Sequence, residues 1–143
     1  MKFIRYIQDN KPEIKIGWIY EDMVGGIEGD MFSDYRRLEA TLPIDRVKLL
    51  APLIPGKIVA VGWNYQDHAK EFDRPVPEYP TIFLKPPSAV IGTGDGIVLP
   101  PTSERVEHEC ELALVIGKKA KTVLPEEAFS YIFGYTVAND VTA

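Results

Sequence analysis

Short apolar runs, broken by glycine, proline and charged residues, follow one another along the whole chain. Such a pattern predicts many short strands and few long helices. Strands are predicted at residues 3–7, 14–20, 23–27, 57–62, 81–85, 107–116 and 134–138. Short helices are predicted at 33–40, 65–72 and 125–132, a proline-containing linker at 43–55 and a tight turn at 92–96. The fold class expected is mainly β with short helices (α+β), with a small β-rich domain at 1–50 followed by a second domain from 51 to 143.

The strand at 107–116 carries the first candidate chemistry. Glu109 and Glu111 lie two residues apart, so they share one face of the strand, about 7 Å apart along it. The other face is apolar and is expected to face the core; its residues are Cys110, Leu112, Leu114 and Ile116. Two carboxylates together repel each other unless a cation neutralises them, and their oxygens suit Mg²⁺, Mn²⁺ or Ca²⁺. The alternative is a solvated strand end.

The same strand also suggests a zinc site, because His108 and Cys110 lie beside the two glutamates and histidine and cysteine are zinc ligands. Strand alternation points both residues away from Glu109 and Glu111. The chain has only one cysteine and two histidines, so no second cysteine or paired histidine completes a zinc set.

A second candidate lies in the helix predicted at 65–72. His68 and Glu71 are three residues apart and so lie on one side of that helix. A carboxylate beside an imidazole can orient the ring and raise its basicity, as in a general base that activates water or moves a proton. The alternative is an exposed helix with one histidine among charged residues.

Two single residues follow apolar strands. Asp140 comes directly after the last strand, where it is either a metal ligand or a turn residue. Lys85 follows the strand at 81–85, where it either binds an anionic substrate or reaches solvent.

Composition excludes several classes of partner. The net charge of −5 gives no basic surface for nucleic acid, and no apolar run reaches membrane-spanning length. The N-terminal residues lack the apolar stretch of a signal peptide. A single cysteine forms no intrachain disulfide, which fits a reducing, cytoplasmic location.

Four segments together resemble the fumarylacetoacetate hydrolase family, in the order that the family shows. They are Val61-Gly62-Trp63-Asn64-Tyr65-Gln66-Asp67-His68-Ala69-Lys70-Glu71, Ile82-Phe83-Leu84-Lys85-Pro86-Pro87-Ser88, the segment from Glu109 to Gly117, and Gly134-Tyr135-Thr136-Val137-Ala138-Asn139-Asp140-Val141-Thr142-Ala143. Residues 1–50 resemble the N-terminal domain of the bacterial branch labelled 2-hydroxyhepta-2,4-diene-1,7-dioate or 5-carboxymethyl-2-hydroxymuconate isomerase. The resemblance implies the first part of that family's mixed β-sandwich roll.

The resemblance also assigns roles. It implies that Glu109, Glu111 and Asp140 bind Mg²⁺ or Mn²⁺ and that His68 and Glu71 form a general-base pair. Lys85, as the cation that follows a buried strand, is taken as the candidate substrate-binding residue. The substrates implied are 2-oxo acids in aromatic or 2-oxo acid catabolism. The reaction is C–C hydrolysis of acylpyruvate or fumarylpyruvate type, oxaloacetate decarboxylation, or isomerisation of 2-hydroxymuconate type, because a shared fold and metal site do not fix the reaction.

The family pattern continues past the point where this chain stops, at Ala143. We therefore expect part of the substrate wall to come from elsewhere, such as a complementary C-terminal chain, and the resemblance also implies a homodimer. The rival hypothesis is a truncated, non-catalytic fragment or one half of a split enzyme.

Overall fold

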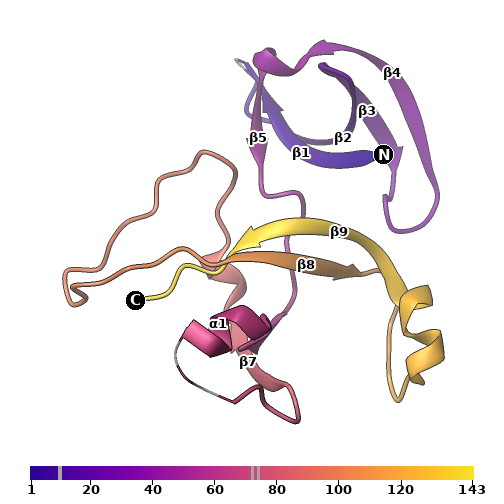
Figure 1. The fold of residues 1–143 in the computed structure, drawn as a ribbon. Coiled ribbons are helices and arrows are strands. Elements are labelled where there is room, and N and C mark those ends of the chain that lie inside the picture. Colours follow the sequence, from indigo (N-terminus) through magenta and orange to yellow (C-terminus); the bar gives the residue numbers. More distant parts are fainter. Residues whose placement is uncertain (10, 72, 74) are drawn as a thin grey trace. The chain divides into compact units, whose positions relative to one another are not determined.

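Strands dominate the computed structural model, which describes residues 1–9, 11–71, 73 and 75–143 (Figure 1). This confirms the mainly β fold with short helices. The chain forms two compact units, one of Met1–Glu28 with Arg36–Asp95 and the other of Gly29–Tyr35 with Gly96–Ala143. The predicted division at residue 50 stays a prediction. No helix in the described part of the chain is long and apolar enough to cross a membrane.

A five-stranded sheet begins the chain, with the strand order β4-β3-β2-β1-β5. A small core forms where Ile4 and Tyr6 on β1 meet Val24 on β3, because alternate residues of a strand point to the same face. The strands are β1 (Lys2–Gln8), β2 (Ile14–Tyr20), β3 (Met23–Gly29), β4 (Tyr35–Pro43) and β5 (Val47–Leu50). This confirms the first three predicted strands.

Gly17 on β2 permits the close packing of this sheet. A Cβ atom at this position would lie 2.6 Å from the Gly25 carbonyl oxygen and 2.8 Å from Cε1 of Tyr6. Real Cβ atoms do not approach other heavy atoms so closely, so no larger residue fits without movement of the backbone. Burial, together with the charge of Glu13, raises the pKa of the Tyr6 hydroxyl.

Two local predictions in this region were wrong. The segment 33–40 was predicted as a helix capped by Ser33 or Asp34, but from Tyr35 it is strand β4, which pairs with β3. The segment 43–55 was predicted as a linker, but it contains a 3₁₀ turn, η1 (Ile44–Arg46), and strand β5. In both places pairing with a neighbouring strand overrides the weak local preference of the sequence.

The rest of the first unit contains a hairpin and a short helix. The hairpin pairs β6 (Ile58–Gly62) antiparallel with β7 (Thr81–Lys85). Helix α1 (Gln66–Glu71) lies between the two strands in sequence, and the 3₁₀ turn η2 (Pro87–Ala89) follows β7. The continuous apolar sequence of β6 is typical of a strand covered on both faces, but Val59 is 59% exposed and Val61 is also exposed. A two-stranded ribbon in the described chain has too few neighbours to cover both faces.

The predicted turn at Gly92–Gly96 is confirmed, and Asp95 fixes it. One Asp95 carboxylate oxygen accepts a hydrogen bond from the Gly92 amide at 2.9 Å, and the other lies 2.9 Å from Lys48 Nζ on β5. The Lys48 ammonium and the Gly92 amide both lower the pKa of the Asp95 carboxyl.

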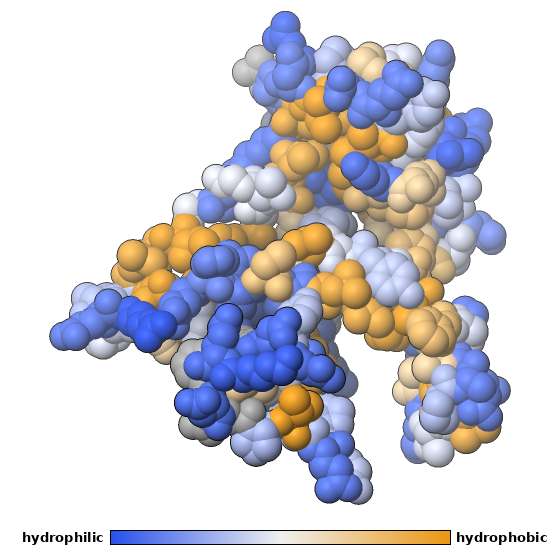
Figure 2. Space-filling model, viewed as in Figure 1, coloured by the Kyte–Doolittle hydropathy of each residue, from blue (hydrophilic) through white to orange (hydrophobic). Residues whose placement is uncertain are grey.

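The second unit is built on a hairpin of β8 (Cys110–Ile116) and β9 (Ile132–Asn139), with a 3₁₀ helix, η3 (Pro125–Tyr131), before β9. The sequence predicts that the β8 face with Leu112 and Leu114 is a core face, and in the described chain this face is not buried. Leu112 is 59% exposed, Leu114 is exposed, and Val137 on β9 is 74% exposed. Apolar side chains accordingly reach the surface around this hairpin (Figure 2). Within the described residues, the hairpin lacks a second layer over this face.

Candidate metal centre

The pairing of β8 with β9 brings the three predicted carboxylate ligands to one face. In this register Glu111 lies opposite Ala138, and one step outside the named strands the Asp140 amide donates to the Glu109 carbonyl at 2.9 Å. Glu109 and Asp140 are therefore directly opposite each other. Directly opposite residues in antiparallel strands project to the same face, and so do residues two apart on one strand. All three residues are half-buried.

This placement fits an ion that prefers oxygen ligands. Directly opposite residues have Cβ atoms about 5 Å apart, which two carboxylates can span to share one cation, and Glu111 follows about 7 Å along the same strand. Within the described residues, no three His, Cys, Asp or Glu side chains are gathered as a metal would require. The backbone register thus suits the ligand set, and the ligand roles stay a prediction.

Two neighbours of Asp140 make contacts that sequence reasoning missed. Asn139 accepts a hydrogen bond at Oδ1 from the Glu109 amide at 3.0 Å, and Thr142 donates its hydroxyl to the Asp140 carbonyl at 3.1 Å. An amide and a hydroxyl flanking an aspartate at a strand end are the available signal, because such side chains often bond to nearby backbone.

His108 and Cys110, the two candidate zinc ligands, alternate with Glu109 and Glu111 along the chain and so do not share their face. Cys110 is exposed and follows Glu109 in the strand, so it projects to the face opposite Glu109 and Glu111. His108 is also exposed. The structure brings no further cysteine to them, because the chain has only one.

Helix α1 is anchored by Ala69, whose side chain is fully buried and whose amide donates to the Tyr65 carbonyl at 3.2 Å. Its outer surface carries an exposed ion pair between Lys70 Nζ and Asp67 at 2.9 Å. The side chain of Glu71 is exposed. The His68 side chain lies outside what the structure describes, so the general-base pair of His68 and Glu71 stays a prediction.

The chain changes direction just before this helix. Trp63 has a φ of 55°, in the left-handed region that non-glycine residues rarely adopt. Such strained residues persist only where the surrounding structure holds them, and they mark sites worth testing for function. Sequence reasoning does not identify this conformation, because a tryptophan carries no preference for it.

Lys85 ends strand β7, where it lies opposite Ile58 of β6. It is half-buried, whereas its neighbour Leu84 is 71% exposed. A partly shielded ammonium group suits an anionic ligand better than a fully solvated one, because its charge is screened less by water. Contact between Lys85 and substrate stays a prediction.

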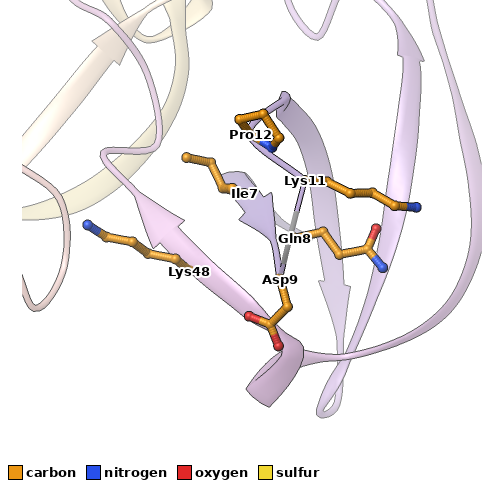
Figure 3. A pocket seen from close by; sticks show the side chains of 6 residues that line it. All are labelled: Ile7, Gln8, Asp9, Lys11, Pro12 and Lys48. Atoms are coloured by element: carbon orange, nitrogen blue, oxygen red, sulfur yellow. The ribbon is translucent and has the colours of Figure 1, made fainter.

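A shallow pocket opens elsewhere in the first unit, around the turn between β1 and β2 (Figure 3). It contains none of the predicted site residues, and its one lysine on β5, Lys48, is already paired with Asp95. Its lining residues are Ile7, Gln8, Asp9, Lys11, Pro12 and Lys48.

Relatives of known name are longer than this chain. Human mitochondrial oxaloacetate tautomerase FAHD2B is 48% identical over 112 residues, which are 76% of this chain and 36% of the human protein. The structure of 5-carboxymethyl-2-hydroxymuconate delta-isomerase from Mycobacterium smegmatis is 36% identical, with a TM-score of 0.85, over 100% of this chain and 56% of that one. The structure of maleylpyruvate hydrolase from Sphingobium sp. SYK-6, in complex with manganese(II) and pyruvate, is 26% identical, with a TM-score of 0.73. The match covers 99% of this chain and 59% of the hydrolase chain. This chain spans about half the length of the isomerase and the hydrolase, and less of the tautomerase.

Two family models divide the sequence between them. The model described as Rv2993c-like, N-terminal matches residues 1–52. The model described as fumarylacetoacetate (FAA) hydrolase, C-terminal matches residues 57–143, which is more than half of the chain and includes every predicted site residue. With this match, and with solved relatives that share its fold over its full length, the chain belongs to the fumarylacetoacetate hydrolase family.

Proposed function

We propose that this chain carries the metal-binding part of a Mg²⁺- or Mn²⁺-dependent enzyme that acts on 2-oxo acids. The observation that supports this most directly is the register that sets Glu109 opposite Asp140, with Glu111 on the same face. The relatives add support from their names, since oxaloacetate and pyruvate are both 2-oxo acids and one relative is complexed with manganese(II). Ca²⁺ is a weaker candidate, because it takes six to eight oxygen ligands, whereas Mg²⁺ takes six and usually keeps several waters among them.

The reaction we favour is proton transfer at the carbon next to the 2-oxo group. Tautomerisation of oxaloacetate consists of this step, and isomerisation of a hydroxymuconate, decarboxylation of oxaloacetate and C–C hydrolysis of an acylpyruvate each develop negative charge at the same position. An enzyme that stabilises enolate charge can therefore serve any of these reactions, and the residues that contact the rest of the substrate select among them.

We assign the candidate residues of this chain to metal binding, proton transfer and substrate binding. Glu109, Glu111 and Asp140 would hold the divalent ion, which when bound supplies Lewis-acid stabilisation of the enolate. His68 would take the proton from the substrate carbon and deliver a proton to the 2-oxo oxygen, which completes the tautomerisation, with Glu71 orienting the imidazole ring. Lys85 would bind a carboxylate of the substrate.

Metal binding is tested by titrating Mn²⁺ and Mg²⁺ into the chain by calorimetry. We expect one site, which Glu109→Gln removes because the neutral amide is a weaker ligand than the carboxylate. The control is Glu107→Gln, two residues earlier in the same segment, where the carboxylate is already engaged by Arg105 at 2.7 Å. Equal binding by the wild type and Glu109→Gln would disprove the proposed ligand set.

Activity is tested on the completed protein, by which we mean this chain supplied with the part of the Mycobacterium smegmatis isomerase that it does not match. Oxaloacetate tautomerisation, oxaloacetate decarboxylation and acylpyruvate hydrolysis are assayed with Mn²⁺. We expect activity on at least one substrate that falls in Glu109→Gln and in His68→Asn. A folded, metal-loaded protein that is inactive on all three would reject the proposed chemistry.

A second candidate function is that of one part of a larger assembly, inactive until a complementary segment covers its apolar faces. The exposed side chains of Leu112 and Val137, which lie opposite each other in the β8–β9 hairpin, favour it, because contiguous exposed apolar surface usually marks an interface. Light scattering of the chain, alone and as the completed protein, separates these states and also tests the expected homodimer. A monomeric chain that gains neither metal affinity nor activity on completion would indicate a non-catalytic fragment.

A further inference from the structure

We propose that Asn139 and Thr142 are positioning residues that set the relative placement of Glu109 and Asp140. The inference rests on the proposed function, in which these two carboxylates share a metal ion. It concerns the backbone between them, where side chains take over bonds that a regular ladder would make with main-chain atoms.

The ladder on either side of Asp140 is regular. Glu107 and Thr142 exchange both backbone hydrogen bonds, at 2.8 and 3.1 Å, and Cys110 pairs with Asn139 inside the hairpin. In an antiparallel ladder, pairs with two reciprocal bonds recur at every second position. The pair between these two, Glu109 with Asp140, is therefore expected to be the next reciprocal pair.

That pair departs from the regular pattern on one side. The Asp140 amide donates to the Glu109 carbonyl at 2.9 Å, as the ladder requires. The Glu109 amide, which in a regular ladder would donate to the Asp140 carbonyl, donates to Oδ1 of Asn139 at 3.0 Å. An asparagine side chain thus takes a position that a main-chain carbonyl would otherwise hold.

The Asp140 carbonyl has a side-chain partner of its own. It accepts a hydrogen bond from the Thr142 hydroxyl at 3.1 Å, two residues along the same strand. One backbone hydrogen bond of the expected reciprocal pair is thus replaced by two side-chain hydrogen bonds, one to Asn139 and one from Thr142. The directions in which Glu109 and Asp140 leave the backbone then depend on these two side chains.

This dependence matters for a metal ion more than for the fold. An ion such as Mg²⁺ demands near-ideal ligand geometry, so a small change in the placement of one carboxylate weakens binding. Groups that orient metal ligands typically change metal affinity by about 10- to 100-fold when they are removed. Both residues lie at the exposed end of the hairpin, so their loss should leave the rest of β8 and β9 paired.

The experiment compares variants that remove each hydrogen bond with variants that keep it. Asn139→Ala removes the acceptor and Asn139→Asp keeps an oxygen at the same place; Thr142→Val removes the hydroxyl and Thr142→Ser keeps it. The control is Thr136→Val, at a threonine on the same strand and the same face as Asp140. Each protein is titrated with Mn²⁺, and amide hydrogen exchange at Glu109 is measured without metal.

We expect Asn139→Ala and Thr142→Val to weaken Mn²⁺ binding by about 10-fold. Asn139→Asp, Thr142→Ser and Thr136→Val should bind within about twofold of the wild type, and hydrogen exchange at the Glu109 amide should accelerate in Asn139→Ala only. If Asn139→Ala and Thr142→Val bind Mn²⁺ like the wild type while Glu109→Gln does not bind it, the positioning role is refuted and the metal site stands. If Glu109→Gln also binds like the wild type, the proposed function fails and this inference with it.

Discussion

Replacing Leu112 with alanine should show which face of the β8–β9 hairpin is covered in the completed protein. Leu112 is 59% exposed, so only about two-fifths of its surface is buried in this chain. Complete burial makes a leucine-to-alanine change cost about 2–5 kcal/mol, and the partial burial scales this to about 1–2 kcal/mol in the chain alone. In the completed protein, a second layer over this face should raise the cost to the full 2–5 kcal/mol.

The measurement is amide hydrogen exchange of β8 and β9, which reports the free energy of opening of this hairpin. Tryptophan fluorescence would not report it, because Trp18 and Trp63 both lie in the first unit. Val98→Ala serves as the control for the chain alone, since Val98 is 92% exposed there and its truncation should cost little. A cost no larger in the completed protein than in the chain alone would refute the idea that a complementary segment covers the Leu112 face.

Three further predictions concern stability, pH dependence and turnover. Gly17→Ala should lower the free energy of unfolding of the first unit, measured by urea denaturation, by about 1–3 kcal/mol, because the added methyl group would lie 2.6 Å from the Gly25 carbonyl oxygen. Gly56→Ala is the control, because a Cβ atom there meets no atom within 4 Å and the change should be neutral. The pKa of Asp95 is lowered in the folded state, so its pairing with Lys48 stabilises the fold fully at pH values above the unfolded pKa of about 3.9. This stabilisation is lost as the pH falls through the lower pKa of the folded state. The stability difference between the wild type and Lys48→Met in thermal melts should therefore shrink in acid, and a pH-independent difference would contradict this pairing. Glu71→Gln should lower the kcat of the completed protein and leave its Mn²⁺ affinity unchanged, and a parallel loss of affinity would contradict a role in proton transfer alone.

Strand positions with a strong alternating or continuous apolar pattern could be predicted from the sequence. The strands at 14–20 and 81–85 were placed with their observed bounds, because turn residues flank them on both sides. The segment from Tyr35 could not be predicted, because its arginines, leucine, glutamate and alanine favour a helix locally. Pairing with β3 decides its structure, and no local pattern contains that information.

The candidate site shows the same division between local and non-local information. Alternation along one strand was sufficient to put Glu109 and Glu111 on one face, because that relation is local. The position of Asp140 opposite Glu109 depends on the register of two strands separated by a 3₁₀ helix and a loop, which the sequence pattern does not specify. The hydrogen bond from Glu109 to Asn139 depends on that register as well, and so it could not be predicted either.

The exposure of the predicted core face reflects the same limit and sharpens the proposed function. Alternation identifies two faces of β8, one with Glu109 and Glu111 and one with Leu112, but it does not say what packs on either. In the described chain the carboxylate face is the more covered of the two, and the leucine face is exposed. Carboxylates held on a partly shielded face attract a cation more strongly than solvated ones, because water screens them less. Covering the opposite face would stiffen the strand that carries them, so metal affinity and hairpin stability should rise together when the protein is completed.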